Sequence, residues 1–442
     1  MLLIFLVLLA LAFIVLAIIK YDIHPFLALF IGAIGYGLAS GMPGALILQS
    51  ITDGFGGVLG RIGLLILLGV IIGTFLEKTG GAFVIAQKVL SWIGEKSVML
   101  AMMITGYILS IPVFGDSTFI MLNPISKSLS FKGKVPYAAT TVALALGATA
   151  SHSMVPPTPG PIAAAGILGA DLGTVIFLGL IISVIALIPC YFFIGYATAN
   201  INIIPKFAAG EEETSSEKFP SVGKSFLPIV VPLVLIVLSS IANYPTQPFG
   251  QNSFTTVLQF IGNPIIALLL GAFMSFALPK KFEIKLLSSS SWVGDALLIA
   301  APIILITGAG GVFGKMLQNS GIADLVSNNL DNARWGLFLP FVMALVLKTA
   351  QGSSTVALIT TASVMAPLLA SLGLDTEMLK VLTVLSIGAG AMAISHANDS
   401  FFWVMTQMSG MSVKQGNQSH SLGTLILSCT AMFIIYVITF FI

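Results

Sequence analysis

Long apolar stretches recur along this chain of 442 residues, and they decide what the chain can fold into. A helix needs roughly 20 apolar residues to cross the hydrocarbon core of a bilayer. Charged residues make up only 8% of the chain, whereas soluble domains contain about 25%. We therefore predict an all-α polytopic membrane protein, which excludes a soluble enzyme and a secreted module. Apolar runs of spanning length cover residues 1–19, 23–41, 61–76, 173–199, 226–242, 254–278, 293–312 and 420–442.

The rest of the composition gives no sign of a bound cofactor or metal. Cys190 and Cys429 lie in separate apolar stretches and form neither a disulfide framework nor a metal-ligand pattern. The net charge is only +2, so there is no basic face for nucleic acid. The stretch 1–19 lacks a basic segment before it, and we expect a retained first span rather than a signal peptide. We expect no cofactor, no metal and no nucleic-acid partner, with membrane lipid as the surroundings.

The two halves of the chain resemble each other in sequence. Four pairs of segments match in order, at offsets of 237 to 244 residues: 24–33 with 263–272, 73–82 with 314–323, 115–118 with 352–355, and 151–152 with 395–396. Weak internal similarity of this kind is typical of transporters built from repeats. We therefore predict a first repeat over 1–205 and a second over 226–442, joined by a polar cytoplasmic linker over 206–225.

The distribution of lysine predicts how the two repeats cross the membrane. Short loops rich in lysine face the cytoplasm. If the lysine clusters around 78–96 and 127–134 are both inside, residues 97–131 must form a re-entrant hairpin. The matching hairpin over 335–371 then enters from outside, so the repeats are inverted and both termini lie outside. With broken helices over 135–170 and 380–413, we predict about ten transmembrane helices plus the two hairpins.

Small polar residues mark the tips of the two predicted hairpins. Glycine permits the turn, and serine or threonine can cap the helix that returns from it. The N-terminus of that helix carries a partial positive charge, which suits a substrate carboxylate. Close packing of small residues is the alternative explanation. The candidate substrate-binding residues at the tips are Gly115, Ser117, Thr118, Gly352, Ser353, Ser354 and Thr355.

The two predicted broken helices supply further candidates. Four prolines within residues 156–161 forbid a continuous helix, and the freed carbonyls can face a cation or substrate hydroxyls. We expect Thr158 and Gly160 to contact substrate there, although a packing kink is the alternative. In the second half, the segment from His396 through Asn398 to Asp399 forms the corresponding break.

Few ionisable residues are expected deep in the membrane, where a charge is costly and usually functional. Lys348 lies four residues before the second tip, and we expect it to bind the substrate carboxylate or an aspartate. Asp116 and Asp399 are candidates to carry a coupling proton, which His152 or His396 could relay. The alternatives are a snorkelling lysine and structural histidines.

Four segments carry a resemblance to a known family: IPVFGDSTFIMLNPISKSL, VPPTPGPIAAAGILGADLG, KTAQGSSTVALITTASVMAPLL and SHANDSFFWV. Together they resemble the gluconate permease (GntP) family, within the wider ion transporter superfamily. The resemblance covers essentially the whole chain.

This resemblance implies a homodimeric, multi-pass inner-membrane symporter of protons and small hydroxy acids, with a moving transport domain of the elevator type. Gluconate, other sugar acids, glycerate and D-serine are the substrates it implies. The chain has Phe114-Gly115 where the family tends to have two aromatics, and Thr158 where it tends to have histidine, which leaves the acid open.

Three other functions compete with a proton-coupled transporter. Hydroxyls and freed carbonyls at the tips are oxygen ligands, so sodium could be the coupling ion instead. Asp116 and Asp399 could form the carboxylate dyad of an intramembrane aspartyl protease, although a protease needs no matched tips. A channel would need a repeated selectivity ring, and none is visible in the sequence. We expect a transporter rather than an enzyme.

Overall fold

The computed structural model describes residues 2–442 except 95–96, 204–218, 244–247, 322–335 and 397–398, and over these residues it is helical with no strand. The first half contains α1 Leu2–Tyr21, α2 Pro25–Ala39, α3 Gly44–Lys78, α4 Gly81–Ile93, α5 Val98–Leu109, α6 Gly115–Gly133, α7 Tyr137–Met154, α8 Pro159–Leu168 and α9 Leu172–Thr198. The second half contains α10 Val222–Ala242, α11 Ser253–Ile261, α12 Pro264–Ser275, α13 Trp292–Asn319, α15 Phe338–Gln351, α16 Ser354–Met365, α17 Glu377–Ala391, α18 Ser400–Ser409, α19 Val413–Gly416, the π-helical turn η5 Asn417–Ser421 and α20 Leu422–Ile438.

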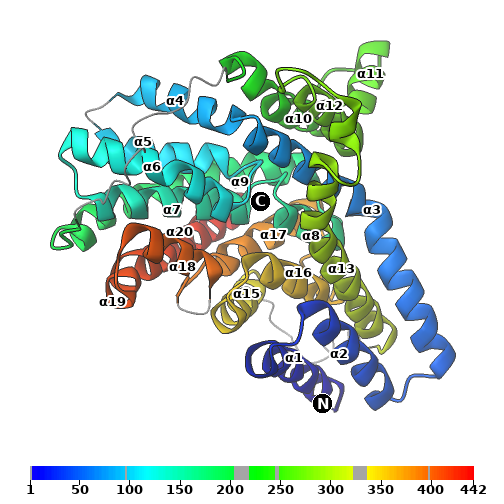
Figure 1. The fold of residues 1–442 in the computed structure, drawn as a ribbon. Helices are drawn as coiled ribbons and strands as arrows, with labels where there is room; N and C mark the ends of the chain where they lie inside the picture. Colours follow the sequence, from blue (N-terminus) through cyan, green and yellow to red (C-terminus); the bar gives the residue numbers. More distant parts are fainter. Residues whose placement is uncertain (1, 95–96, 204–218, 244–247, 322–335, 397–398) are drawn as a thin grey trace.

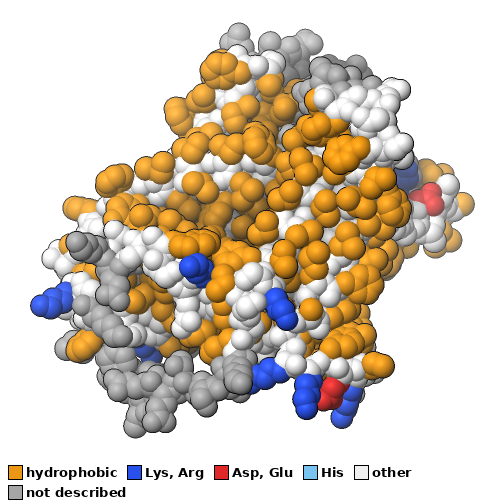
Figure 2. All heavy atoms as spheres, turned by 90° about the horizontal axis from the view of Figure 1, so that it is seen from above, with side chains coloured by type: hydrophobic (Ala, Val, Ile, Leu, Met, Phe, Trp, Pro, Cys, Tyr) orange, Lys and Arg blue, Asp and Glu red, His pale blue; other side chains and the backbone are white. Residues whose placement is uncertain are grey.

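Several helices are long and apolar enough to cross a membrane. Among the described residues, five stretches meet this condition by length and composition, and the pair α11 and α12 makes a sixth if it counts as one bent span. The surface in Figure 2 is largely hydrophobic, with few charged side chains. The predicted all-α membrane fold is confirmed, while the count of ten spans and the inverted repeats stay predictions.

The helix boundaries differ from two of the apolar runs and from the predicted linker. The run 61–76 belongs to the 35-residue helix α3, which begins at Gly44 and extends along one side of the molecule in Figure 1. The run 254–278 is bent by 67° between α11 and α12, because Pro264 starts a new helix that Asn263 caps. The last four residues of the predicted linker already belong to α10, and its part 206–218 lies outside the described residues.

Four interruptions separate successive helices of the chain. The chain breaks at 110–114 between α5 and α6, and at 155–158 between α7 and α8, where Pro112, Pro156 and Pro157 cannot continue a helix. It also breaks at 352–353 between α15 and α16, and a fourth interruption separates the end of α17 at Ala391 from the start of α18 at Ser400. Gly352 adopts φ 81°, a left-handed conformation that glycine tolerates without strain.

Glycine allows the same close helix contact in both halves. An added Cβ at Gly147 of α7 would overlap the carbonyl oxygen of Met103 in α5, and one at Gly390 of α17 would overlap that of Phe341 in α15. The pairs α5–α7 and α15–α17 therefore pack backbone against backbone, as small residues permit in membrane helices. These two contacts hold each interrupted helix against its neighbour and so position all four breaks.

Candidate functional site

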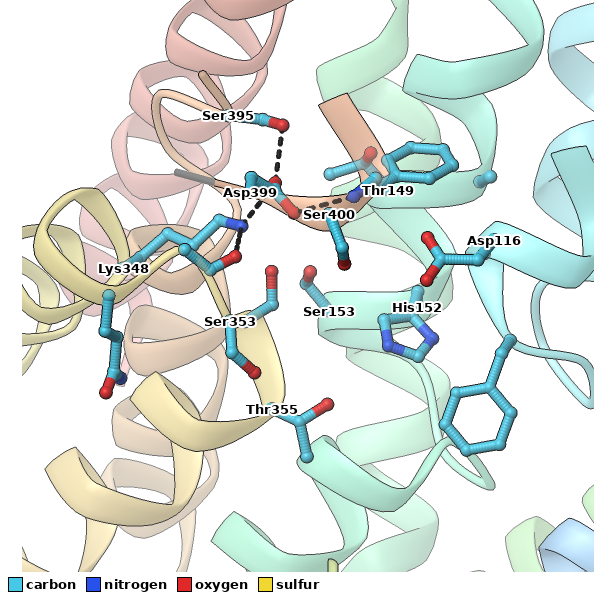
Figure 3. Close-up of a pocket in the computed structure, with 17 residues that line it drawn as sticks. Asp116, Thr149, His152, Ser153, Lys348, Ser353, Thr355, Ser395, Asp399 and Ser400 are labelled. Carbon is cyan, nitrogen blue, oxygen red and sulfur yellow. Dashed lines mark hydrogen bonds and ion pairs between the residues drawn. The ribbon is translucent and has the colours of Figure 1, made fainter. Parts of the chain in front are cut away.

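Three of the four helix breaks border one cavity of about 350 Å³, and the last turns of α7 complete it, as Figure 3 shows. Residues far apart in sequence meet there because these helix ends lie close together, whereas the break at 155–158 borders a separate, smaller pocket. The walls are formed by Phe114, Gly115, Asp116, Ala148, Thr149, His152, Ser153, Lys348, Gln351, Gly352, Ser353, Ser354, Thr355, Ser395, Asp399, Ser400 and Phe401. The cavity thus combines residues from both halves of the chain.

A buried ion pair forms one wall of this cavity. The ammonium Nζ of Lys348 lies 2.6 Å from Oδ2 of Asp399, and both side chains are less than a tenth exposed. Lys348 also donates a hydrogen bond to the carbonyl oxygen of Gly352 at 2.5 Å, so it holds the second tip as well. A buried charge is tolerated only when it is paired and hydrogen-bonded. Lys348 therefore points inward and is no snorkelling lysine.

Asp399 is held by hydrogen bonds as well as by its ion pair. Ser395 donates a hydrogen bond to Oδ2 at 2.5 Å, and the backbone N–H of Phe401 donates one to Oδ1 at 3.0 Å. Asp399 is also the N-cap of α18. Both carboxylate oxygens are thus occupied by donors of the protein.

Asp116 differs from Asp399, because its side chain has no hydrogen-bond or ion-pair partner among the described residues. It lies in the first turn of α6, and in Figure 3 its carboxylate enters the cavity from the side opposite Lys348, near His152. Within the described part of the chain, no hydrogen bond or ion pair to its side chain is found. Asp116 is therefore the carboxylate of this cavity that is free to exchange a proton or to contact a substrate.

Three helices begin at the cavity. Gly115, Ser354 and Ser400 are the first residues of α6, α16 and α18, and all three line the walls. The side chain of Ser353 caps α16 by accepting a hydrogen bond from the N–H of Val356 at 3.3 Å. Each helix N-terminus carries about half a positive charge, which favours an anion. The cavity is consequently suited to a carboxylate.

The structure brings most of the predicted site residues to this cavity. The predicted residues on its walls are Gly115, Asp116, His152, Lys348, Gly352, Ser353, Ser354, Thr355 and Asp399.

Other predicted residues lie beside the cavity and not on its walls. Ser117 is hydrogen-bonded to Glu77, and the hydroxyl of Thr118 is fully buried. Gly160 packs against Leu358 and Thr355 of α16. Thr158 donates a hydrogen bond to the carbonyl oxygen of Val155 at 2.7 Å and borders a smaller separate pocket.

The second predicted break is only partly described. His396 does not line the cavity, because its Nε2 is hydrogen-bonded to the carbonyl oxygen of Thr349 at 3.1 Å. Asn398 lies outside the described residues.

Sequence reasoning missed several wall residues. Thr149 and Ser153 lie on the last turns of α7, on either side of the predicted His152. Ser395, Ser400 and Phe401 flank Asp399 in the second break. Helical spacing from His152 would have found Thr149, since residues three apart share a helix face. Phe114 and Gln351 adjoin the two predicted tips and complete the wall.

The arrangement argues against a carboxylate dyad of the protease type. Such a dyad needs two carboxylates close enough to share one proton. Asp399 instead forms an ion pair with Lys348 and accepts two further hydrogen bonds.

The fold has a counterpart among solved membrane proteins. Its fold is similar to that of the YdaH transporter of Alcanivorax borkumensis, with a TM-score of 0.58, 13% identity, and coverage of 89% of this chain and 88% of that chain. The family model described as GntP family permease matches residues 1–441. The chain therefore belongs to the GntP permease family, which confirms the predicted resemblance.

Two relatives show which cargoes occur in similar proteins. A gluconate permease of Pseudomonas aeruginosa is 35% identical, covering 90% of this chain and 88% of that protein. The D-serine transporter DsdX of Escherichia coli is 28% identical, covering 98% of each. The protein is thus a permease and not an enzyme.

Proposed function

We propose that the protein is a proton-coupled symporter of a small hydroxy-carboxylate and that it works by alternating access. Gluconate, a related sugar acid, glycerate and D-serine are the candidate cargoes, supported by the names of the relatives. The cargo would bind in the cavity that three helix breaks and the end of α7 surround. We place the protein in the inner, or plasma, membrane as a multi-pass homodimer.

The charge balance of the cavity carries this proposal. Lys348 contributes one positive charge, while Asp399 and Asp116 contribute two negative charges when both are ionised. The three side chains then sum to one net negative charge, which repels a carboxylate. A proton on Asp116 makes the sum zero, and the helix N-termini can then hold the anion. Binding of the anion and binding of the proton therefore favour each other, which is the requirement for symport.

The walls offer different contacts to the two ends of a hydroxy acid. The carboxylate would lie at Lys348 and the starts of α16 and α18. The hydroxyls of Ser353, Ser354 and Thr355 line the same side and can bind cargo hydroxyls. A site that hydrogen-bonds a cargo hydroxyl rejects analogues lacking it far better than an apolar wall does.

The matching helix pairs support alternating access. The pairs α5–α7 and α15–α17 use the same glycine contact, as two related units would. In transporters with inverted repeats, the two units surround a binding site near the midplane and expose it to each side in turn.

Sodium coupling is the second candidate. Several hydroxyl oxygens line the cavity, and oxygen is the ligand type that hard cations prefer. Asp116, a carboxylate without a recorded partner, could neutralise sodium as well as a proton.

One experiment distinguishes these possibilities. The purified protein is reconstituted into liposomes, and uptake of labelled gluconate is measured under a pH gradient, a sodium gradient, or neither. Unlabelled glycerate, D-serine and unsubstituted propionate then compete for uptake. We expect accumulation with the pH gradient alone and no competition by propionate. Accumulation that needs sodium would favour the second candidate, and no accumulation of any hydroxy acid would contradict both.

A further inference from the structure

A fully buried histidine lies directly behind the cavity wall. His420 has no exposed surface, and neither ring nitrogen has a hydrogen-bond partner in the described structure. Leaving a buried polar atom unsatisfied costs about 1–3 kcal/mol. Such a group in a folded protein calls for an explanation, and a functional role is one of the recognised ones.

His420 belongs to a turn of unusual geometry. It lies within the π-helical turn η5, between α19 and α20. π-turns occur as single turns and are frequent at functional sites, since the extra residue redirects the side chains. Here the ring of His420 meets that of Phe401 at 5.8 Å in an edge-to-face arrangement. Phe401 also lines the cavity, so it contacts both the cavity and His420.

The same turn is connected to both oxygens of Asp399. On one side, Ser421 donates a hydrogen bond to the carbonyl oxygen of Ser395, whose hydroxyl donates to Oδ2 of Asp399. On the other side, Phe401 contacts His420 with its ring and donates its backbone N–H to Oδ1. Asp399 and the turn η5 are therefore connected by two short chains of contacts.

Within the described part of the chain, the charged groups that act on His420 are Asp399 and Lys348. Leu146 of α7 and Cys190 of α9 contact Gly423, which follows His420 by three residues. Lys414 on α19 is exposed.

We propose that His420 is a second proton site of the transport cycle, screened by Phe401, that becomes the partner of Asp399 when a cargo carboxylate binds Lys348. This proposal rests on the proposed function. Once cargo occupies the ammonium of Lys348, the carboxylate of Asp399 loses its counter-charge, and an unpaired charge there is costly. A proton from water in the cavity then binds a ring nitrogen of His420 when Phe401 rotates. The imidazolium formed in this way replaces the ammonium beside Asp399.

The number of protons linked to cargo binding tests the proposal. The KM for gluconate exchange is measured from pH 5 to 8 in liposomes for the wild type, His420→Gln and the matched control His24→Gln. His24 is an exposed helix cap far from these residues in sequence. The slope of log KM against pH counts the protons taken up with cargo, so it should fall by about one in His420→Gln and stay unchanged in the control. A KM raised equally at every pH would mean a purely structural role and would overturn the proposal.

Chemical modification gives a readout that does not depend on transport. Carbethoxylation of His420 by diethyl pyrocarbonate is followed by mass spectrometry in the wild type and in Phe401→Ala. We expect the rate to rise at least about tenfold without the phenylalanine ring, since a buried group reacts only through rare openings. Gluconate should lower the rate in the wild type, because diethyl pyrocarbonate reacts with the neutral imidazole and not with the imidazolium. Equal rates in both proteins, with or without gluconate, would overturn the proposal while leaving gluconate uptake, and thus the proposed function, intact.

Discussion

Lys348 and Asp399 are 51 residues apart in sequence, yet their charged atoms lie 2.6 Å apart inside the protein. Lys348 lies in the last turn of α15 and Asp399 is the N-cap of α18, so the pair joins two helix interruptions that the chain forms separately. The pair fixes the position of both, and it leaves Asp116 as the unpartnered carboxylate of the cavity. This division of roles between two aspartates leads to the first two predictions.

Removal of one member of the pair should destabilise the protein, whereas removal of both should not. Lys348→Met leaves the charge of Asp399 buried and unpaired, at a cost of about 3–5 kcal/mol. When Lys348→Met is combined with Asp399→Asn, neither charge of the pair remains. Most of the lost stability should then return, although transport should not. Thermal unfolding in detergent measures the cycle. If the double variant loses as much stability as Lys348→Met and Asp399→Asn lose together, the two residues do not act as a unit.

Asp116→Asn should strongly reduce the accumulation of substrate under a pH gradient but spare the exchange of internal for external substrate. Asparagine cannot release a proton, and exchange needs no net proton movement. Labelled-substrate accumulation and exchange are compared in the same liposomes. Asp295→Asn is the matched control, because Asp295 is half exposed in an ion pair with Lys78 away from the cavity. If Asp116→Asn and Asp399→Asn both still concentrate substrate, neither carboxylate carries the proton.

Loss of the hydroxyl at the second tip should weaken cargo binding. Ser354 and Thr355 lie in the first turn of α16 and line the cavity. Ser354→Ala and Thr355→Val each remove one hydrogen-bonding group, worth about 0.5–1.5 kcal/mol, so the apparent KM should rise roughly twofold to tenfold. Ser117→Ala is the control, since Ser117 bonds to Glu77 outside the cavity. Unchanged kinetics in both tip variants would place the cargo elsewhere.

The sequence predicted the helical membrane fold and the principal cavity residues because both depend on local signals. Proline and glycine clusters mark the helix breaks, and rare charges such as Lys348 and Asp116 stand out in an apolar chain. Contacts between distant segments leave no such signal. Nothing local shows that the hydroxyl of Ser117 points to Glu77, or that the ring of Phe401 lies against His420.

The bend between α11 and α12 was missed for a related reason. Hydropathy alone treats 254–278 as one run, although Asn263-Pro264 is a clear local signal for a new helix. The buried polar atoms of His420 are visible only once the π-turn and its neighbours are placed.

The matching glycine contacts predict equal sensitivity in the two halves. Gly147→Ala and Gly390→Ala each place a methyl group against a carbonyl oxygen of the neighbouring helix, at Met103 and Phe341. Overpacking of this kind costs about 1–3 kcal/mol, so both variants should unfold at lower temperature than the wild type. Gly44→Ala, which meets open space, is the control. Loss of stability in only one half would argue against equivalent helix pairs.

If the two halves are inverted as predicted, two loops should have opposite accessibility. Gly133 lies at the end of α6 and Asp375 lies just before α17, and both are exposed. In a variant lacking Cys190 and Cys429, each position is replaced in turn by cysteine and treated with a membrane-impermeant maleimide. Gly133→Cys should react only in inverted vesicles and Asp375→Cys only in intact cells, because the lysine-rich loop at 127–134 faces the cytoplasm. Reaction of Gly133→Cys from outside alone would reverse the hairpin and remove the basis for alternating access through inverted repeats.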